Sequence, residues 1–142
     1  MEAKKVPSRP MAADLERLVE RAAAVRERAY APYSRFAVGA AVLGASGEVH
    51  VGCNVENASY GLSSCAERNA LGAAVAAGEK EIRAVAVVTG SSPPAPPCGA
   101  CRQLIFELGR DATVVLANPD GGRVVYRLSD LYPHSFGPEF LG

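Results

Sequence analysis

The sequence predicts an α/β fold: a three-layer α-β-α sandwich with a five-stranded mixed sheet whose last two strands are antiparallel. Two observations lead to this prediction. Helical and extended patterns follow one another in the order helix, two strands, helix, strand, helix, two strands. Only residues 118–122 separate the last two extended runs, which is too short for a parallel crossover. Three helices suffice to cover both faces of such a sheet.

Three segments have the composition and spacing of helices. Residues 11–29 repeat apolar side chains at helical intervals, which indicates one buried face, and a break follows at 31–34. Residues 65–77 are rich in alanine, and Gly78 ends them. Residues 99–108 form the third predicted helix, which Gly109 stops.

The remaining regular segments are predicted to be strands. Residues 36–43 and 48–53 flank turn material at 44–47 and predict a β-hairpin. Residues 82–89 are β-branched and apolar, as in a buried strand. The last pair is 113–117 and 123–127. Residues 54–64 and the proline-rich 91–97 are predicted loops, and residues 131–142 an extended arm.

Composition limits the classes of function. The 142 residues fit one domain, predicted at 11–142 after a flexible leader at 1–10. With 15 basic and 15 acidic residues the net charge is zero, which argues against a nucleic-acid partner and favours a small ligand. No stretch has the character of an export signal or a membrane span, so we expect a cytoplasmic protein without a membrane partner. In that reducing setting, cysteines more often serve metals or catalysis than disulfides.

Three of the four cysteines have a spacing that is typical of a catalytic zinc site. Cys65 opens the second predicted helix, and Cys98 and Cys101 open the third. A helix start presents free N–H groups and partial positive charge, which should lower thiol pKa values and favour the thiolate. Three protein ligands that leave one position for water form the catalytic pattern.

Other interpretations of these cysteines remain open on spacing alone. A Cys-x-x-Cys pair is also common in structural zinc sites and in redox pairs. A structural site would need a fourth ligand, for which Cys53, His50 and His134 are the candidates. Glu67 favours the catalytic interpretation, because a carboxylate two residues after a ligand can reach a water at the metal without binding the metal itself.

Arg68 is a candidate for tuning the charge of this site. Three thiolates on one Zn²⁺ leave a net negative centre, which should make a bound water harder to deprotonate. A guanidinium group that donates hydrogen bonds to cysteine sulfur would offset this effect. We therefore expect Arg68 to tune the site, although an ordinary surface arginine is the simpler alternative.

At these residues the chain resembles a known family. The motifs Cys65-Ala66-Glu67 and Pro97-Cys98-Gly99-Ala100-Cys101 resemble the zinc-deaminase signature in its three-cysteine variant. Residues 33–41, 52–60, 98–103 and 135–139 also match in order. The whole set resembles the cytidine deaminases of the short, homotetrameric class, and it covers nearly all of the chain after the leader.

The resemblance implies a cofactor, a reaction and a set of site residues. One Zn²⁺ per subunit and Glu67 as the catalytic residue are expected to deaminate cytidine and 2′-deoxycytidine to uridine and 2′-deoxyuridine, in pyrimidine salvage. Asn54 and Glu56 are expected to hydrogen-bond the sugar, Phe36 to pack on the pyrimidine, and Ala66 to line the substrate site. The resemblance further places three residues near the ligand of a neighbouring subunit and so implies a homotetramer with shared sites: Ala58, Tyr60 and Phe136.

Residue 65 bears on the class of substrate. Polynucleotide and transfer-RNA deaminases of this superfamily typically have histidine where this chain has Cys65, and they need basic surface for phosphates. A free nucleoside is therefore favoured. The rival interpretations are a structural zinc or interaction module, a deaminase of another small substrate, and a nucleic-acid editor.

Overall fold

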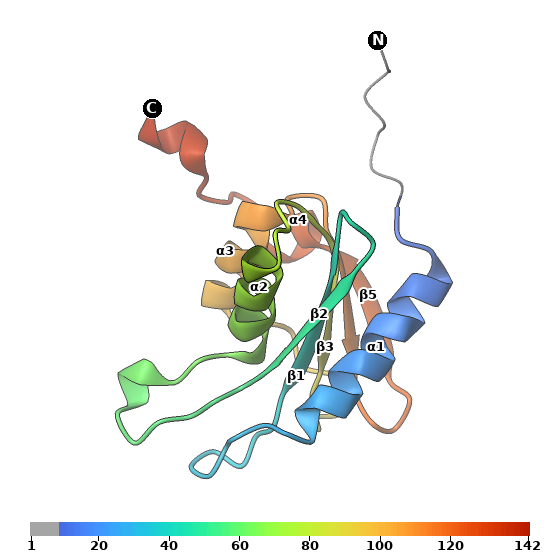
Figure 1. Cartoon of the computed structure of the whole chain (residues 1–142), viewed down its shortest axis with the longest axis vertical. Coiled ribbons are helices and arrows are strands. Elements are labelled where there is room, and N and C mark those ends of the chain that lie inside the picture. The colour runs from blue at the N-terminus through green and yellow to red at the C-terminus, as the bar shows by residue number, and fades with distance from the viewer. Residues whose placement is uncertain (1–8) are drawn as a thin grey trace.

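A single five-stranded sheet forms the centre of the structure, a computed structural model that describes residues 9–142. Figure 1 shows the sheet with helices on both sides. The strands are β1 (Gly39–Gly44), β2 (Val49–Cys53), β3 (Ile82–Val88), β4 (Thr113–Ala117) and β5 (Arg123–Arg127). Their order is β2-β1-β3-β4-β5. Strands β3 and β4 run parallel, and the three other neighbouring pairs are antiparallel.

The main helices take the positions that the sequence predicts. Helix α1 (Ala12–Arg26) precedes the β1–β2 hairpin, α2 (Ala66–Ala76) leads into β3, and α3 (Gly99–Leu108) leads into β4. The predicted α/β class, the mixed sheet and the antiparallel last pair are confirmed. Of the predicted leader, only Arg9 and Pro10 lie within the described residues.

Two apolar layers hold the helices to the two faces of the sheet. Side chains of a strand alternate between the faces, so the three central strands, β1, β3 and β4, contribute to both layers. The first layer joins α1 to one face through Leu18, Val19, Ala22, Ala41, Leu43, Ala84, Ala86, Val88, Val115 and Ala117. The second joins α2 and α3 to the other face through Ala40, Val42, Ala66, Ala70, Leu71, Ala74, Val85, Val87, Ile105, Phe106, Val114 and Leu116.

Helix α2 packs directly against the backbone of the sheet at Gly52. A Cβ atom at this position would lie 2.4 Å from the backbone nitrogen of Ala70 and 2.8 Å from the carbonyl oxygen of Ala66. Only glycine therefore lets the first turns of α2 rest on β2 without displacement. This contact fixes the height of the N-terminal end of α2 above the sheet, and that end carries Cys65 and Glu67.

The structure departs from the predicted elements at several short segments. The predicted first helix, 11–29, ends at Arg26, and the predicted first strand, 36–43, begins only at Gly39. The predicted loop 54–64 contains a 3-10 turn, Tyr60–Leu62. A short helix α4 (Leu128–Leu131) follows β5, and Pro138–Leu141 forms a 3-10 turn within the predicted extended arm. These three short elements contain only three or four residues each, which is too few for a hydrophobic period to show in the sequence.

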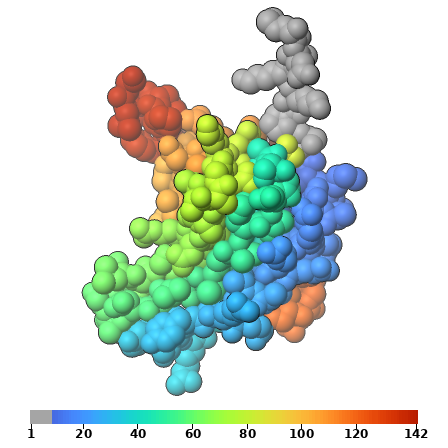
Figure 2. All heavy atoms as spheres, viewed as in Figure 1, coloured from blue at the N-terminus to red at the C-terminus, as the bar shows by residue number. Residues whose placement is uncertain are grey.

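Two segments stand out from the body of the molecule. Figure 2 shows residues 54–64, in green, as a protrusion at one end, and the C-terminal residues, in red, as a knob that projects away from the sheet. Phe140 and Leu141 in that knob are 66% and 78% exposed. Within residues 9–142, no helix combines the length and the apolar character needed to cross a membrane.

Candidate active site

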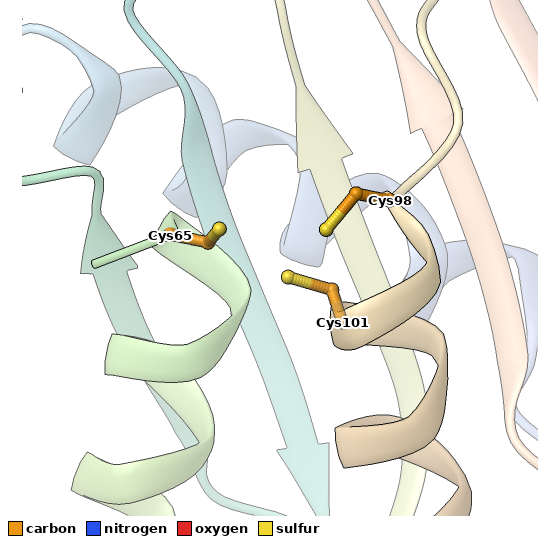
Figure 3. Close-up of side chains that lie close together, drawn as sticks. All are labelled: Cys65, Cys98 and Cys101. Carbon is orange, nitrogen blue, oxygen red and sulfur yellow. The ribbon is translucent and has the colours of Figure 1, made fainter. Parts of the chain in front are cut away.

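The three predicted metal ligands come together between the starts of α2 and α3. Cys65 occupies the position before the first turn of α2, and Cys98 the equivalent position of α3. Cys101 lies one turn further along α3 and is buried. Figure 3 shows the three side chains directed toward one another, and their sulfur atoms all lie within 4.8 Å of each other.

This donor set fits a zinc ion. Three convergent thiols on two helix starts offer soft ligands, and a tetrahedral zinc ion held by three protein ligands keeps one position for a water or a substrate. The group within 4.8 Å consists of these three residues alone in the described part of the chain, without Cys53, His50 or His134. The structure therefore does not support the alternative of a structural zinc with four protein ligands.

The thiols differ in how readily they ionise. Burial raises the pKa of Cys98, but hydrogen bonds from Cys101 and from the backbone of Ala100 outweigh it and hold this pKa below the ordinary thiol value. Burial raises the pKa of Cys65 and that of Cys101. At these two cysteines the effect of burial thus exceeds the lowering of the thiol pKa that their places at helix starts predict. Zinc must displace their protons, so zinc affinity depends on pH.

Glu67 lies in the first turn of α2 and is only 5% exposed. Burial raises the pKa of its carboxyl group, and hydrogen bonds from its own backbone and from the Cys101 thiol offset this effect in part. Glu67 is thus beside the cysteine group without belonging to it. A carboxyl group with a raised pKa next to a metal site is suited to accept and return a proton.

Arg68 does not make the contact that its predicted role requires. Its side chain is exposed, and within the described residues it forms no hydrogen bond with cysteine sulfur. Arg102 takes a structural position instead: its Nε donates to the carbonyl oxygen of Pro97 at 2.9 Å, and Nη1 donates to that of Leu131 at 2.6 Å. The charge-tuning role of Arg68 stays a prediction.

Asn54 and Glu56 both face the segment between α1 and β1. The Asn54 amide donates to the carbonyl oxygen of Phe36 at 2.8 Å and accepts from the N–H of Val38 at 2.9 Å. The Glu56 carboxylate accepts from the backbone N–H groups of Tyr33 and Ser34 at 2.9 and 3.1 Å, and from the Ser34 hydroxyl. The hydrogen bond from that hydroxyl is the main reason why the pKa of Glu56 lies below its ordinary value.

A cavity of about 320 Å³ lies next to Glu56. It is lined by Tyr33, Ser34, Glu56, Tyr60 and Ser63, and the rings of Tyr33 and Tyr60 meet edge to face at 6.0 Å. A larger cavity of about 810 Å³ lies near the C-terminal end of α3 and is lined by no cysteine, so it is not part of this site.

The remaining predicted substrate residues differ in how far they are buried. Ala66 is fully buried at the start of α2. Phe36 and Tyr60 are 43% and 76% exposed, and Ala58 is exposed in the same loop as Tyr60. Phe136 lies in the C-terminal arm, 52% exposed and stacked on Phe140 at 5.7 Å. Such exposed aromatic residues are free to contact a ligand or a second chain.

Two residues that the sequence analysis did not select connect the parts of the site. Asn69 donates to the carbonyl oxygen of Cys53 at 2.8 Å and accepts from the Ser64 hydroxyl at 2.7 Å. It thereby ties the segment before Cys65 to the end of β2. Gln103 donates to the carbonyl oxygen of Phe136 at 2.9 Å and anchors the arm. A single asparagine such as Asn69 belongs to no sequence pattern that would mark it as part of a site. Gln103 could have been selected, because it lies within a motif that resembles the family.

Comparison with known proteins gives one consistent result. Residues 12–117 match the family model described as the cytidine and deoxycytidylate deaminase zinc-binding region. The cytidine deaminase of Halalkalibacterium halodurans is 48% identical over 127 residues, which are 89% of this chain and 96% of that protein. The crystal structure of the cytidine deaminase from Burkholderia pseudomallei is 52% identical, with a TM-score of 0.82, over 85% of this chain and 98% of that one. That of Mycobacterium tuberculosis is 43% identical, with a TM-score of 0.76, over 87% and 98%.

The fold and the cysteine site together define a zinc-dependent deaminase. The chain belongs to the cytidine and deoxycytidylate deaminase family. The predicted resemblance, the enzyme class and Zn²⁺ as the cofactor are confirmed.

Proposed function

We propose that this chain hydrolyses cytidine and 2′-deoxycytidine to uridine and 2′-deoxyuridine, with release of ammonia. The observation that carries the proposal is the group of three cysteine sulfurs within 4.8 Å, with the buried carboxyl group of Glu67 beside it. Its relatives that are named cytidine deaminases support the substrate class. Residues 11–142 then act as a single deaminase domain.

Glu67 moves the protons in the proposed reaction. When Cys65, Cys98 and Cys101 hold Zn²⁺, the metal supplies a Lewis acid that lowers the pKa of a water molecule at the site. Glu67 takes a proton from the attacking water and delivers it to N3 of the pyrimidine, which makes C4 electrophilic. After the water oxygen has added to C4, Glu67 takes the remaining proton from the new C4 hydroxyl group and delivers it to the exocyclic amine. The C4–N bond then breaks, the C4 carbonyl forms, and ammonia leaves. The raised pKa of Glu67 is consistent with one carboxyl group acting as base and acid in turn.

Asn54 and Glu56 support a nucleoside as the substrate. Both residues come from one extended segment and both contact residues 33–38, so their polar groups lie on the same side of that segment. We propose that they hold the sugar hydroxyls while they order this segment, and that Phe36 packs on the base and Ala66 lines the pocket. The cavity beside Glu56 is lined by a carboxylate and by no lysine or arginine, which disfavours a substrate with a phosphate group.

Ala58, Tyr60 and Phe136 support a shared site in a homotetramer. All three are exposed, and they lie on the two segments that protrude from the body, 54–64 and the C-terminal arm (Figure 2). In the proposed assembly, these residues approach the ligand of a neighbouring subunit. The enzyme would work in pyrimidine salvage in the cytoplasm.

Ultraviolet absorbance tests this function directly. Purified zinc-loaded protein is mixed with cytidine, 2′-deoxycytidine or deoxycytidylate. The expected result is a fall in absorbance that matches conversion to the uracil product for both nucleosides, a much slower change for the nucleotide, and no change with Cys65→Ala. Turnover of deoxycytidylate in preference to the nucleosides, or no turnover at all, would contradict the proposal.

A further inference from the structure

A second group of metal-binding side chains lies away from the cysteines. Glu48 directly precedes β2 and His50 lies within it, two residues further on, and Glu79 comes from the loop between α2 and β3. Side chains two apart on an extended strand point to the same face. One donor atom from each of the three residues lies within 4.8 Å of the others.

This group is separate from the proposed active site. Glu79 follows the C-terminal end of α2, whereas Cys65 precedes its N-terminal end. Helix α2 contains 11 residues, so about 16 Å of helix lies between the two ends. Figure 1 shows the turn of the β1–β2 hairpin near the C-terminal end of α2. Neither Glu48, His50 nor Glu79 has a part in the proposed deamination.

The surrounding backbone is shaped to hold the Glu79 carboxylate. A Cβ atom at Gly44 would fall 2.0 Å from the carboxyl carbon of Glu79, so glycine is required for the carboxylate to lie there. Ser46 donates to Glu79 Oε1 from its backbone N–H at 3.3 Å and to Oε2 from its hydroxyl at 2.5 Å. Metal-binding carboxylates are commonly oriented by such outer hydrogen bonds.

His50 faces the same oxygen and is largely out of solvent. Its Nε2 lies 2.8 Å from Glu79 Oε2, and the side chains of His50 and Glu79 are only 10% and 7% exposed. Glu48 brings a second carboxylate to this pair and forms no side-chain hydrogen bond within the described residues. Two carboxylates are thus held together with an imidazole, and no lysine or arginine in the described part of the chain forms an ion pair with either carboxylate.

We propose that Glu48, His50 and Glu79 bind a divalent transition-metal ion, which ties the β1–β2 hairpin to the loop after α2. A cation between the two carboxylates removes their mutual repulsion, and neutral His50 coordinates it through Nε2. One imidazole and two carboxylates suit Zn²⁺ and Co²⁺ without any thiolate, and three protein ligands leave positions for water. The alternative is that the hydrogen bond between His50 and Glu79 ties the hairpin by itself.

The zinc content of the purified protein distinguishes these two possibilities. The protein is equilibrated with micromolar Zn²⁺, and bound zinc is counted by elemental analysis. The wild type is expected to hold two zinc ions per chain, and His50→Gln and Glu48→Gln one each. The chain has one other histidine, His134, so His134→Gln is the matched control and should keep two. Ser46→Ala should weaken the second site by about 10–100-fold.

Cobalt absorption provides an independent reading of the second site. Co²⁺ added to protein that holds one zinc should give weak visible bands without the intense bands of thiolate ligands, and His50→Gln should abolish them. One zinc per chain in the wild type would overturn the inference. Retention of the second zinc in Glu48→Gln would also overturn the inference. This variant should fold normally, because the Glu48 side chain is exposed and forms no hydrogen bond within the described residues. Neither readout depends on deaminase activity.

Discussion

The reactive residues lie at the starts of two helices, and burial there sets the direction of most of their pKa shifts. Cys65 and Cys98 cap α2 and α3, and Glu67 and Cys101 lie in the first turns behind them. Burial acts on Glu67 and Cys101 in the same direction, since it raises the pKa of both groups. A metal that replaces the thiol protons, beside a carboxyl group that can accept and return a proton, provides the parts needed for hydrolysis.

Glu56 is expected to determine nucleoside binding more than turnover. It accepts three hydrogen bonds from Tyr33 and Ser34, and Gln in its place lacks the charge that strengthens them. We predict that Glu56→Gln raises KM for cytidine roughly tenfold, with a smaller effect on kcat. Steady-state kinetics measure both, with Glu20→Gln, an exposed change on α1, as control. An unchanged KM would show that Glu56 does not bind the sugar of the substrate.

The helices and strands could be predicted where the sequence has a regular hydrophobic pattern. Residues 82–88 are apolar and β-branched and form β3, and residues 99–108 form α3 with the predicted bounds. Helix α4 and the 3-10 turns are too short to contain a repeating hydrophobic pattern, so the sequence did not predict them. Within the site, the sequence predicted which three cysteines would come together, and the structure brings their sulfur atoms within 4.8 Å of one another. The bonds of Asn69 depend on a loop and a strand that only the fold brings together.

The contact between α2 and β2 gives a prediction at the scale of the element. In Gly52→Ala the new methyl group meets the backbone of Ala70 at 2.4 Å, so α2 must shift. We expect a loss of about 1–3 kcal/mol in unfolding free energy, measured by denaturant unfolding. A shift of about 1 Å in Glu67 should also lower kcat by roughly 100-fold.

Gly72→Ala is the matched control in the same helix. Nothing lies within 4 Å of a Cβ atom at Gly72, so alanine should stabilise α2 by about 0.5–1 kcal/mol. If both alanine variants were equally stable and active, the close approach at Gly52 would not position the site.

At the scale of the whole molecule, two protruding segments expose large apolar side chains. The C-terminal arm exposes Phe136, Phe140 and Leu141, and the 54–64 loop exposes Tyr60 and Leu62. Gln103 anchors only the backbone of the arm at Phe136. These surfaces are the natural contacts of the proposed homotetramer, which predicts a mass in solution of four chains of 14.8 kDa.

Mixed assemblies test whether the sites are shared. Glu67→Ala and Phe136→Ala chains are each expected to be poorly active alone. When the two are co-expressed and assembled at random, about one site in four combines an intact Glu67 with an intact Phe136 from a neighbour. We therefore predict recovery of cytidine deamination in the mixed sample. Activity no higher than that of the two separate variants would mean that Phe136 does not act across subunits.

The rate of cytidine deamination by Glu67→Gln, measured with its zinc content on the same sample, tests the central claim most directly. A proton-transferring carboxyl group typically contributes about 10²–10⁴-fold. We predict that this variant loses at least 100-fold in kcat while Cys65, Cys98 and Cys101 retain their zinc. Activity within a few-fold of the wild type at full zinc content would contradict the assignment of Glu67.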